Sequence, residues 1–346
     1  MDLMRPRLPD RRKLQPERAL VLLLFTLFIA AEIAGSTISP SALDYISANP
    51  NLRPDGKSLP SGEQPVQVAV NHIAKASQLR TLYSDAGFEL AKVRLGTARV
   101  PSLFLGQLPK DLGDLRNITD RKNLFVRIVL PLILRQNAVV LRQRERLTRL
   151  VNLPIGELAQ QDRQWLVRLA SLYRVIREEQ GAGALTALQR MELLNRVDVV
   201  PASLALAQAA AESGWGTSRF ARRGNALFGQ WTWGKEAGLV PQERAAGLGH
   251  RVRVFQNLLG SVSGYIHNLN VSQHYAGYRA VRSVLRRAGG PDGTWGRRLV
   301  ETLQAYSVEG PEYIRKIKSI IRTNQFEDFE TAKISDKAIS SATPSS

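Results

Sequence analysis

The sequence contains no cysteine and only four histidines among its 346 residues. Without cysteine the chain cannot form disulfide bonds, thiolate nucleophiles or cysteine-ligated zinc sites. The histidines are His72, His250, His267 and His274. Because none of them stands in the His-Glu-x-x-His spacing of a zinc hydrolase, we expect no bound metal.

Other signatures of common chemistries are also missing. The sequence has no Gly-x-Ser-x-Gly nucleophile elbow, no phosphate-binding loop and no dinucleotide fingerprint, so we expect no cofactor. It has no internal repeat, and no basic run is interleaved with aromatic residues as in proteins that bind single-stranded nucleic acid. We therefore expect no nucleic-acid partner. The oligomeric state is left open.

Positive charge is in clear excess. The 48 lysines and arginines outnumber the 30 acidic residues and give a net charge of +18. Such a charge attracts polyanions, which include anionic lipid headgroups and anionic polymers of the cell envelope. The alternative is a solvated basic surface that only aids solubility.

The N-terminus combines a basic flank in residues 1–18 with an uncharged apolar run in residues 19–31. This order is typical of a secretory signal or a signal anchor. The run is shorter than the roughly 20 residues of a membrane-spanning helix, which favours a cleaved signal. The long flank and the modest cleavage site at residues 34–36 leave an anchor open, and a core helix is a third possibility. With either signal the chain lies in the periplasm, secreted or tethered to the inner membrane.

Composition and periodicity predict five segments. They are a signal peptide or anchor (1–35), a linker and irregular or helical region (36–120), a helical region (121–195), a main functional domain (196–328) and a flexible tail (329–346). Apolar spacing predicts helices over 125–150, 162–178 and 185–196. Pro131 is expected to start or kink the first of these helices.

Residues 200–218 place a single carboxylate at the end of an alanine-rich helix, followed by Gly-Trp-Gly. Pro201 suits the first turn of a helix, and the alanines that follow are strong helix formers. Gln208 and Glu212 are four residues apart and share a helix face. Desolvation on an apolar face would raise the pKa of Glu212 toward that of a general acid. A helix-end glutamate bonded to a serine or backbone group is the alternative.

The following residues mix aromatic side chains with turns. Residues 224–233 hold two tryptophans and a phenylalanine between glycines, which suits either a stacking wall for sugar rings or a core cluster. Residues 230–255 alternate turn residues with short apolar runs and predict a small β-hairpin lobe. Helical spacing returns over 258–288, and residues 306–318 lead from a turn into a closing helix.

Five motifs in this order resemble the glucosaminidase family of peptidoglycan hydrolases, described as mannosyl-glycoprotein endo-β-N-acetylglucosaminidase-like, in its Bax branch. The resemblance is strong over 196–325 and weaker over 120–200. The motifs are Arg196-Val-Asp-Val-Val-Pro201, Ala207-Gln-Ala-Ala-Ala-Glu-Ser-Gly-Trp-Gly-Thr-Ser-Arg-Phe220, Gly224-Asn-Ala-Leu-Phe-Gly-Gln-Trp231, Ser261-Val-Ser-Gly-Tyr-Ile-His-Asn-Leu-Asn270 and Tyr306-Ser-Val-Glu-Gly-Pro-Glu-Tyr313.

The resemblance implies a mainly α, lysozyme-like α+β fold with a helical catalytic lobe, a small β lobe and a long groove. It implies hydrolysis of the β-1,4 bond after N-acetylglucosamine in peptidoglycan glycan strands. Glu212 falls on the catalytic acid, and Tyr313 on a tyrosine near the reacting sugar. The expected substrate contacts are Gln208, Trp215, Asn225, Phe228, Trp231, Tyr275 and Tyr306, with Phe228 and Trp231 on the groove wall.

The sequence departs from the family where relatives often carry a glutamate before the Val-x-x-Phe of the β lobe. This chain has Arg251 there, and the other candidates for a second carboxylate are Glu236, Glu243 and Glu309. The simpler hypothesis is substrate assistance, in which the 2-acetamido group attacks the anomeric carbon and Tyr313 steadies it. A non-catalytic glycan-binding or scaffold protein and a lytic transglycosylase are the alternatives.

Overall fold

The computed structural model describes residues 70–71, 73–177, 185–232, 238–239, 251–307 and 309–335. The predicted signal or anchor and the linker up to residue 63 lie outside the described residues. The helices are α3 (Ala76–Asp85), α4 (Leu90–Arg94), α5 (Ile118–Leu150), α6 (Gln160–Leu172), α7 (Ala187–Arg196), α8 (Ala202–Ser213), α9 (Arg219–Gly224), α10 (Leu258–Val271), α11 (Ala276–Arg287), α12 (Trp295–Val300) and α13 (Pro311–Thr323). Short 3-10 turns include η1 (Leu112–Asp114), η2 (Ile155–Glu157), η4 (Gln273–Tyr275), η5 (Gln304–Tyr306) and η6 (Phe326–Phe329).

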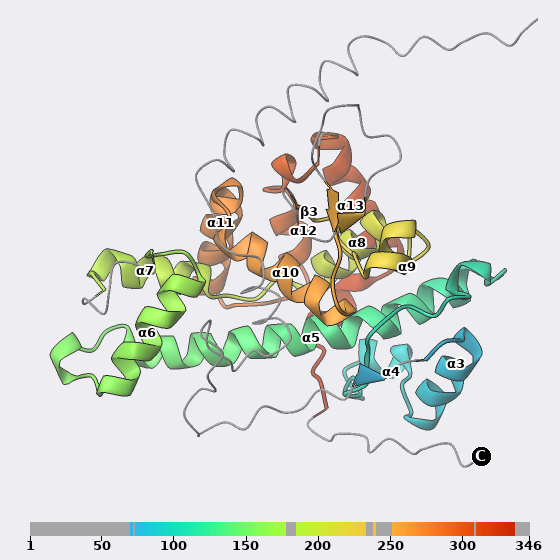
Figure 1. Cartoon of the computed structure of the whole chain (residues 1–346), viewed down its shortest axis with the longest axis horizontal. Helices are drawn as coiled ribbons and strands as arrows, with labels where there is room; N and C mark the ends of the chain where they lie inside the picture. The colour runs from blue at the N-terminus through green and yellow to red at the C-terminus, as the bar shows by residue number, and fades with distance from the viewer. Residues whose placement is uncertain are drawn as a thin grey trace, which may run out of the picture.

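The long helix α5 runs along one side of a helical assembly, and α8 and α10 pack against it (Figure 1). Helix α8 lies at the centre, since it also packs against α12, α13 and η6. Helices α3 and α4 lie near one end of α5, and α6 and α7 near the other. The predicted mainly α class is therefore confirmed for the described residues.

Helix α5 begins earlier than the sequence predicted. The Asn117 side chain accepts hydrogen bonds from the backbone of Thr119 and Asp120 and so caps the first turn. Pro131 lies inside the helix and is buried, so the expectation that it starts the helix is wrong. Of the described helices, α5 is long and apolar enough to cross a membrane, but 61% of that apolar window is buried within the protein. It packs as a core helix.

The described strands are few and short. Strands β3 (Trp231–Thr232), β5 (Arg251–Arg253) and β4 (Gly238–Leu239) form an antiparallel sheet in that order, as predicted for residues 230–255. A parallel pair joins β1 (Val70–Asn71) to β2 (Phe104–Leu105). The helical segment predicted over 258–288 is instead two helices, because the backbone of Ser272 is extended.

The beginning and the end of the described chain pack together. Val100 forms a parallel β-bridge with Ile334, and Arg94 lies over the Phe329 ring at 4.4 Å. Residues 329–335 are therefore packed against the rest of the described chain, and residues 336–346 of the predicted tail lie outside the described residues. One apolar cluster extends from Ala76 to Phe329, across the predicted boundaries at 120 and 195.

Candidate active site around Glu212

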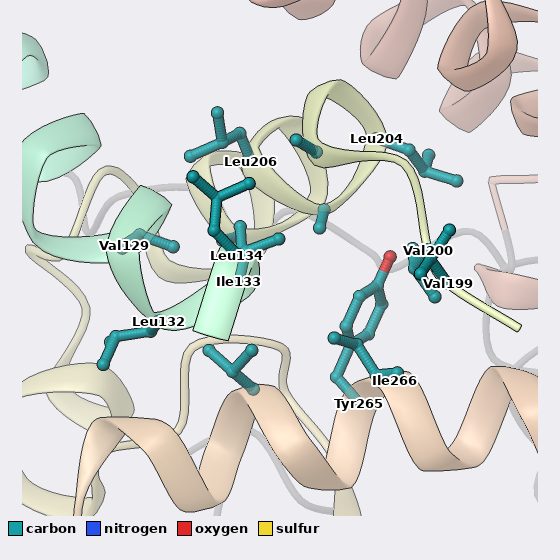
Figure 2. Close-up of a cluster of buried hydrophobic side chains, with 14 of the residues drawn as sticks. Val129, Leu132, Ile133, Leu134, Val199, Val200, Leu204, Leu206, Tyr265 and Ile266 are labelled. Carbon is teal, nitrogen blue, oxygen red and sulfur yellow. The ribbon is translucent and has the colours of Figure 1, made fainter. Parts of the chain in front are cut away.

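Helix α8 is the most enclosed helix near the predicted acid. Every residue from Ala202 to Ala210 is buried. In Figure 2 Leu206 lies beside Leu134 of α5 and Leu204 lies near Val200, and both leucines are buried. Small side chains allow this close approach, and on the α12 side a Cβ at Gly296 would overlap the Ser203 hydroxyl.

An arginine cluster fixes the segment that leads into α8. Arg286 Nε donates to the Asp198 carboxylate at 3.0 Å, and Arg144 lies 3.6 Å from it. Arg282 donates to the backbone carbonyls of Asp198 and Val199, at 3.1 Å each. Burial would raise the pKa of Asp198, but these arginines outweigh it and lower the pKa below its ordinary value. The first motif of the sequence thus anchors the helix.

A left-handed turn ends α8 at Gly214, two residues after Glu212. Gly214, Trp215 and Gly216 have φ angles of 58°, 58° and 80°. This conformation is uncommon for a tryptophan, and at Gly216 there is no room for a side chain, because a Cβ would lie 2.9 Å from Leu112 and 3.2 Å from Phe125. Packing from η1 and α5 therefore sets where the helix stops.

The two carboxylate oxygens of Glu212 have different surroundings. Oε1 accepts a hydrogen bond from the Tyr313 hydroxyl at 3.0 Å. Oε2 faces Gly229, where an added Cβ would lie 3.6 Å from it. One oxygen is thus held by the protein, and the other faces a residue without a side chain.

Burial raises the pKa of Glu212 above its ordinary value. The Tyr313 hydrogen bond and the charge of Lys316 lower the pKa, and the charge of Glu309 raises it, but burial is the largest effect. A glutamate with a raised pKa keeps its proton closer to neutral pH, as a general acid requires.

Tyrosine hydroxyls surround this carboxylate. The Tyr313 ring stacks on Tyr306 with centroids 5.4 Å apart, and Tyr306 lies 6.1 Å from Tyr275. Burial, and to a lesser extent the charge of Glu212, raises the pKa values of all three hydroxyls. All three hydroxyls remain protonated; Tyr313 donates to Glu212, and Tyr306 donates to the Phe228 carbonyl at 3.4 Å.

Three residues expected to contact substrate are buried. Gln208 is 0% exposed, and both ends of its amide bond to tyrosines. Phe228 is 3% exposed and stacks on Tyr265, with centroids 3.9 Å apart. Asn225 donates to the Phe255 carbonyl at 2.9 Å. None of these side chains has an exposed face, so they support the site without lining it.

The other expected substrate contacts with described side chains differ in how exposed they are. The half-buried Trp215 indole packs on Phe125 and Phe326, with Lys122 over its ring at 4.7 Å. Tyr275 is 8% exposed, whereas Tyr306 is half-buried beside Tyr313.

The residues of the β lobe are described only in part. The backbones of Trp231 and Thr232 pair with Val252 and Arg251. The side chains of Trp231 and Arg251 lie outside the described part of the structure, as do Glu236 and Glu243.

Sequence reasoning missed three residues near Glu212. Gly229 gave no signal, because only geometry shows that it faces Oε2. Lys316 follows Tyr313 by three residues on α13, a spacing that could have placed it on the same face. Tyr265 lies within the Ser261–Asn270 motif, but its contact with Gln208 joins distant segments. Among the described residues, no cluster of three metal-ligating side chains is present.

Comparison with known proteins agrees with this geometry. A family model described as "Glucosaminidase: Mannosyl-glycoprotein endo-beta-N-acetylglucosaminidase" matches residues 189–326. "Protein bax" of Escherichia coli (strain K12) is 32% identical over 217 residues, which cover 62% of this chain and 74% of that protein. No solved structure matches. With these two matches, the chain belongs to the glucosaminidase family, in its Bax branch.

Proposed function

We propose that this protein is a hydrolase that cleaves the β-1,4 bond after N-acetylglucosamine in bacterial peptidoglycan, with Glu212 as the general acid. The observation that carries the proposal is the asymmetry of Glu212. Its Oε1 is held by Tyr313, whereas Oε2 faces Gly229, where no side chain stands. Burial supports the acid role because it raises the pKa of Glu212.

Substrate assistance is the mechanism that needs fewest protein groups. Glu212 gives its proton to the glycosidic oxygen while the acetamido carbonyl oxygen bonds to the anomeric carbon and the glycosidic bond breaks. Water then attacks the anomeric carbon, the bond to the acetamido oxygen breaks, and the carboxylate of Glu212 takes a proton from the water. The product is a reducing-end N-acetylglucosamine, and the acid is restored.

Among the described carboxylates, Glu309 is the candidate for a second catalytic group. It precedes α13, lies 3.8 Å from Lys316 and is exposed, and its charge raises the pKa of Glu212. Glu309 thus pairs with a lysine at the surface, and Arg251 stands where relatives often carry a glutamate, so we favour the acetamido group. The Tyr313 hydroxyl accepts a hydrogen bond from Gln208 and donates one to Glu212, and its steadying of the acetamido group stays a prediction.

The family match supports a peptidoglycan-type glycan as substrate. The net charge of +18 suits a protein that works beside anionic envelope polymers and the inner-membrane surface. We therefore also propose a periplasmic location, in which the N-terminal segment serves as a cleaved signal or as a tether to the inner membrane.

Muropeptide analysis tests the activity. Incubation of the purified protein with cell-wall sacculi should release fragments that end in reducing N-acetylglucosamine, as mass spectrometry can detect. Anhydro-muramic ends would instead indicate a lytic transglycosylase, and unchanged sacculi would indicate a non-catalytic binding protein.

Glu212→Gln is the matched variant, because it keeps size and shape but cannot donate the proton. We expect its rate of fragment release to fall by about 10²-fold to 10⁴-fold, with thermal unfolding near that of the wild type. Digestion by Glu212→Gln at the wild-type rate would contradict the assignment of the acid.

A further inference from the structure

A buried chain of hydrogen bonds ends at Glu212. Tyr265 on α10 donates to Gln208 Oε1 at 2.6 Å, and Gln208 Nε2 donates to the Tyr313 hydroxyl at 2.8 Å. Tyr313 in turn donates to Glu212 Oε1 at 3.0 Å. In Figure 2 the Tyr265 hydroxyl points away from α10, into the layer that α8 occupies. Three helices thus contribute to one chain of donors.

The direction of the chain follows from the number of protons. Each tyrosine hydroxyl has one proton, and an ionised carboxylate only accepts. Because Gln208 donates to Tyr313, the proton of Tyr313 is left for Glu212. If the amide were turned over, Gln208 Oε1 would accept that proton, and the carboxylate would lose its donor.

Tyr265 selects between the two orientations of the amide. Its hydroxyl is buried, and within the described residues Gln208 Oε1 is the acceptor it reaches. With the amide turned over, the Tyr265 proton would face a donor instead. A buried donor without an acceptor is unfavourable, so Tyr265 holds the amide nitrogen toward Tyr313.

We propose that Gln208 is a positioning residue whose amide, oriented by Tyr265, directs the single hydroxyl proton of Tyr313 to Glu212. The inference rests on the proposed role of Glu212 as the acid and assigns Gln208 to the protein side of the site instead of to the substrate. After the acid has given up its proton, the chain stabilises the carboxylate that remains.

Other charged groups also act on Glu212. Lys316 lowers its pKa, and Glu309 raises it. Tyr275 and Tyr306 are neutral phenols near it. None of these four groups depends on the amide of Gln208. The effect of the hydrogen-bond chain on the pKa of Glu212 can therefore be separated from the effects of these four groups by changing Tyr265. Tyr265 carries no charge and lies beyond Gln208 in the hydrogen-bond chain.

Tyr265→Phe is the sharpest test, since it removes one hydroxyl and keeps the ring that stacks on Phe228. The full chain is labelled with carbon-13 at the glutamate carboxyl, and Glu212→Gln assigns the signal of Glu212. NMR titration then gives its pKa. We expect Tyr265→Phe to raise the pKa of Glu212 by up to about one unit. In this variant the Gln208 amide is free to turn, so Tyr313 donates less often to the Glu212 carboxylate.

The control is the same substitution in a Tyr313→Phe background, where the chain is already cut. There Tyr265→Phe should leave the pKa of Glu212 unchanged. An equal shift in both backgrounds, or no shift in either, would overturn the proposal. Circular dichroism and thermal unfolding establish that each variant is folded.

Two substitutions at Gln208 give an independent test if Tyr265→Phe does not fold. Gln208→Glu supplies an acceptor that takes the Tyr313 proton, and Gln208→Met removes both donor and acceptor at similar size. Gln208→Glu should raise the pKa of Glu212 more than Gln208→Met, and more in the wild-type background than in Tyr313→Phe. Equal shifts for both substitutions would contradict the proposal.

Activity gives a separate readout. With sacculi as substrate, the basic limb of the kcat/KM profile should move to higher pH in Tyr265→Phe, as the pKa of the acid rises. If the wild type leaves sacculi unchanged, the proposed function fails, whereas the NMR titration still decides whether the chain acts on Glu212.

Discussion

Gly229 has no side chain at the position that faces Glu212 Oε2. Its φ angle is +60°, in the left-handed region, and an added Cβ would lie 3.6 Å from the carboxylate oxygen. In the proposed reaction, a side chain there would occupy the space that a glycosidic oxygen must enter to receive the proton. The glycine is therefore expected to matter for access to the acid as well as for the turn.

Gly229→Ala tests this with Gly87→Ala as a matched control. Gly87 has a φ of +61° and no atom within 4 Å of an added Cβ. Both substitutions should cost about 1 kcal/mol of stability, because alanine is strained at positive φ. Only Gly229→Ala should also slow the release of muropeptides. Equal activity of the two variants would contradict a role of Gly229 in access.

Residue spacing alone foresaw part of the site. The four-residue spacing of Gln208 and Glu212 predicted a shared face, and both side chains do meet Tyr313. Residue type did not reveal exposure, however. Phe228 was expected on a groove wall, yet it is buried against Tyr265, since an aromatic side chain is equally suited to a core and to a sugar site.

Helix α8 is capped by a carboxylate from a distant segment. Glu330 accepts hydrogen bonds from the backbone of Ala202 at 3.1 Å and of Ser203 at 3.4 Å, and from the Ser203 hydroxyl. The backbone N–H groups of the first turn have no acceptor within the helix, and the helix dipole favours negative charge at this end. The two ends of α8 thus carry two carboxylates, Glu330 at the start and Glu212 near the end.

The cap predicts a pH dependence of stability. Burial raises the pKa of Glu330 to about 7, outweighing the hydrogen bonds from Ser203 and Ala202 that lower it. An unfolded glutamate titrates near about 4.3, so the folded state holds more protons between these values. The contribution of Glu330 to stability is present below the lower pKa and is lost as pH rises to about 7.

Glu330→Gln should remove this dependence, because the amide does not titrate. Urea unfolding of both proteins between pH 4 and pH 8 measures it: the wild type should lose stability relative to the variant as pH rises. The difference between the two proteins isolates Glu330 from carboxylates such as Asp198, whose lowered pKa acts in the opposite direction. A constant difference across this range would contradict the prediction.

Elements were easier to predict than their ends. The helix predicted over 185–196 is α7, which begins at a capping box of Thr186 and Gln189. Helix α5 continues through Pro131, because the helix is buried on all sides over residues 128–134 and this burial outweighs the lost backbone hydrogen bond. Local propensity cannot show such tertiary contributions.

At the scale of the whole molecule, the folded unit is larger than the segment that matches the family. Residues 189–326 contain Glu212 and Tyr313 but lack α5, the η1 residue Leu112 that packs on Gly216, and the Glu330 cap. The apolar core includes residues on both sides of this segment. Much of the surface that packs against α8 therefore comes from residues outside the matched segment.

A truncation experiment follows from this packing. A fragment of residues 189–326 should show no cooperative thermal unfolding, whereas residues 73–335 should unfold cooperatively, as circular dichroism can measure. The shorter fragment exposes the faces of α8 and α10 that α5 covers, so it should also aggregate. A cooperative transition in the short fragment would show that α5 is dispensable.

The packing of Val100 against Ile334 and the Glu330 cap also imply an order in which the parts of the site are completed during synthesis. Protein synthesis proceeds from the N-terminus, so Glu212 and Tyr313 leave the ribosome before the residues that cap and close α8. Until residues 329–335 follow, Glu212 on α8 and Tyr313 on α13 lack part of their final packing. Maturation of the candidate site is thereby coupled to the synthesis of residues 329–335, and a prematurely ended chain would carry Glu212 without the packing that orients it.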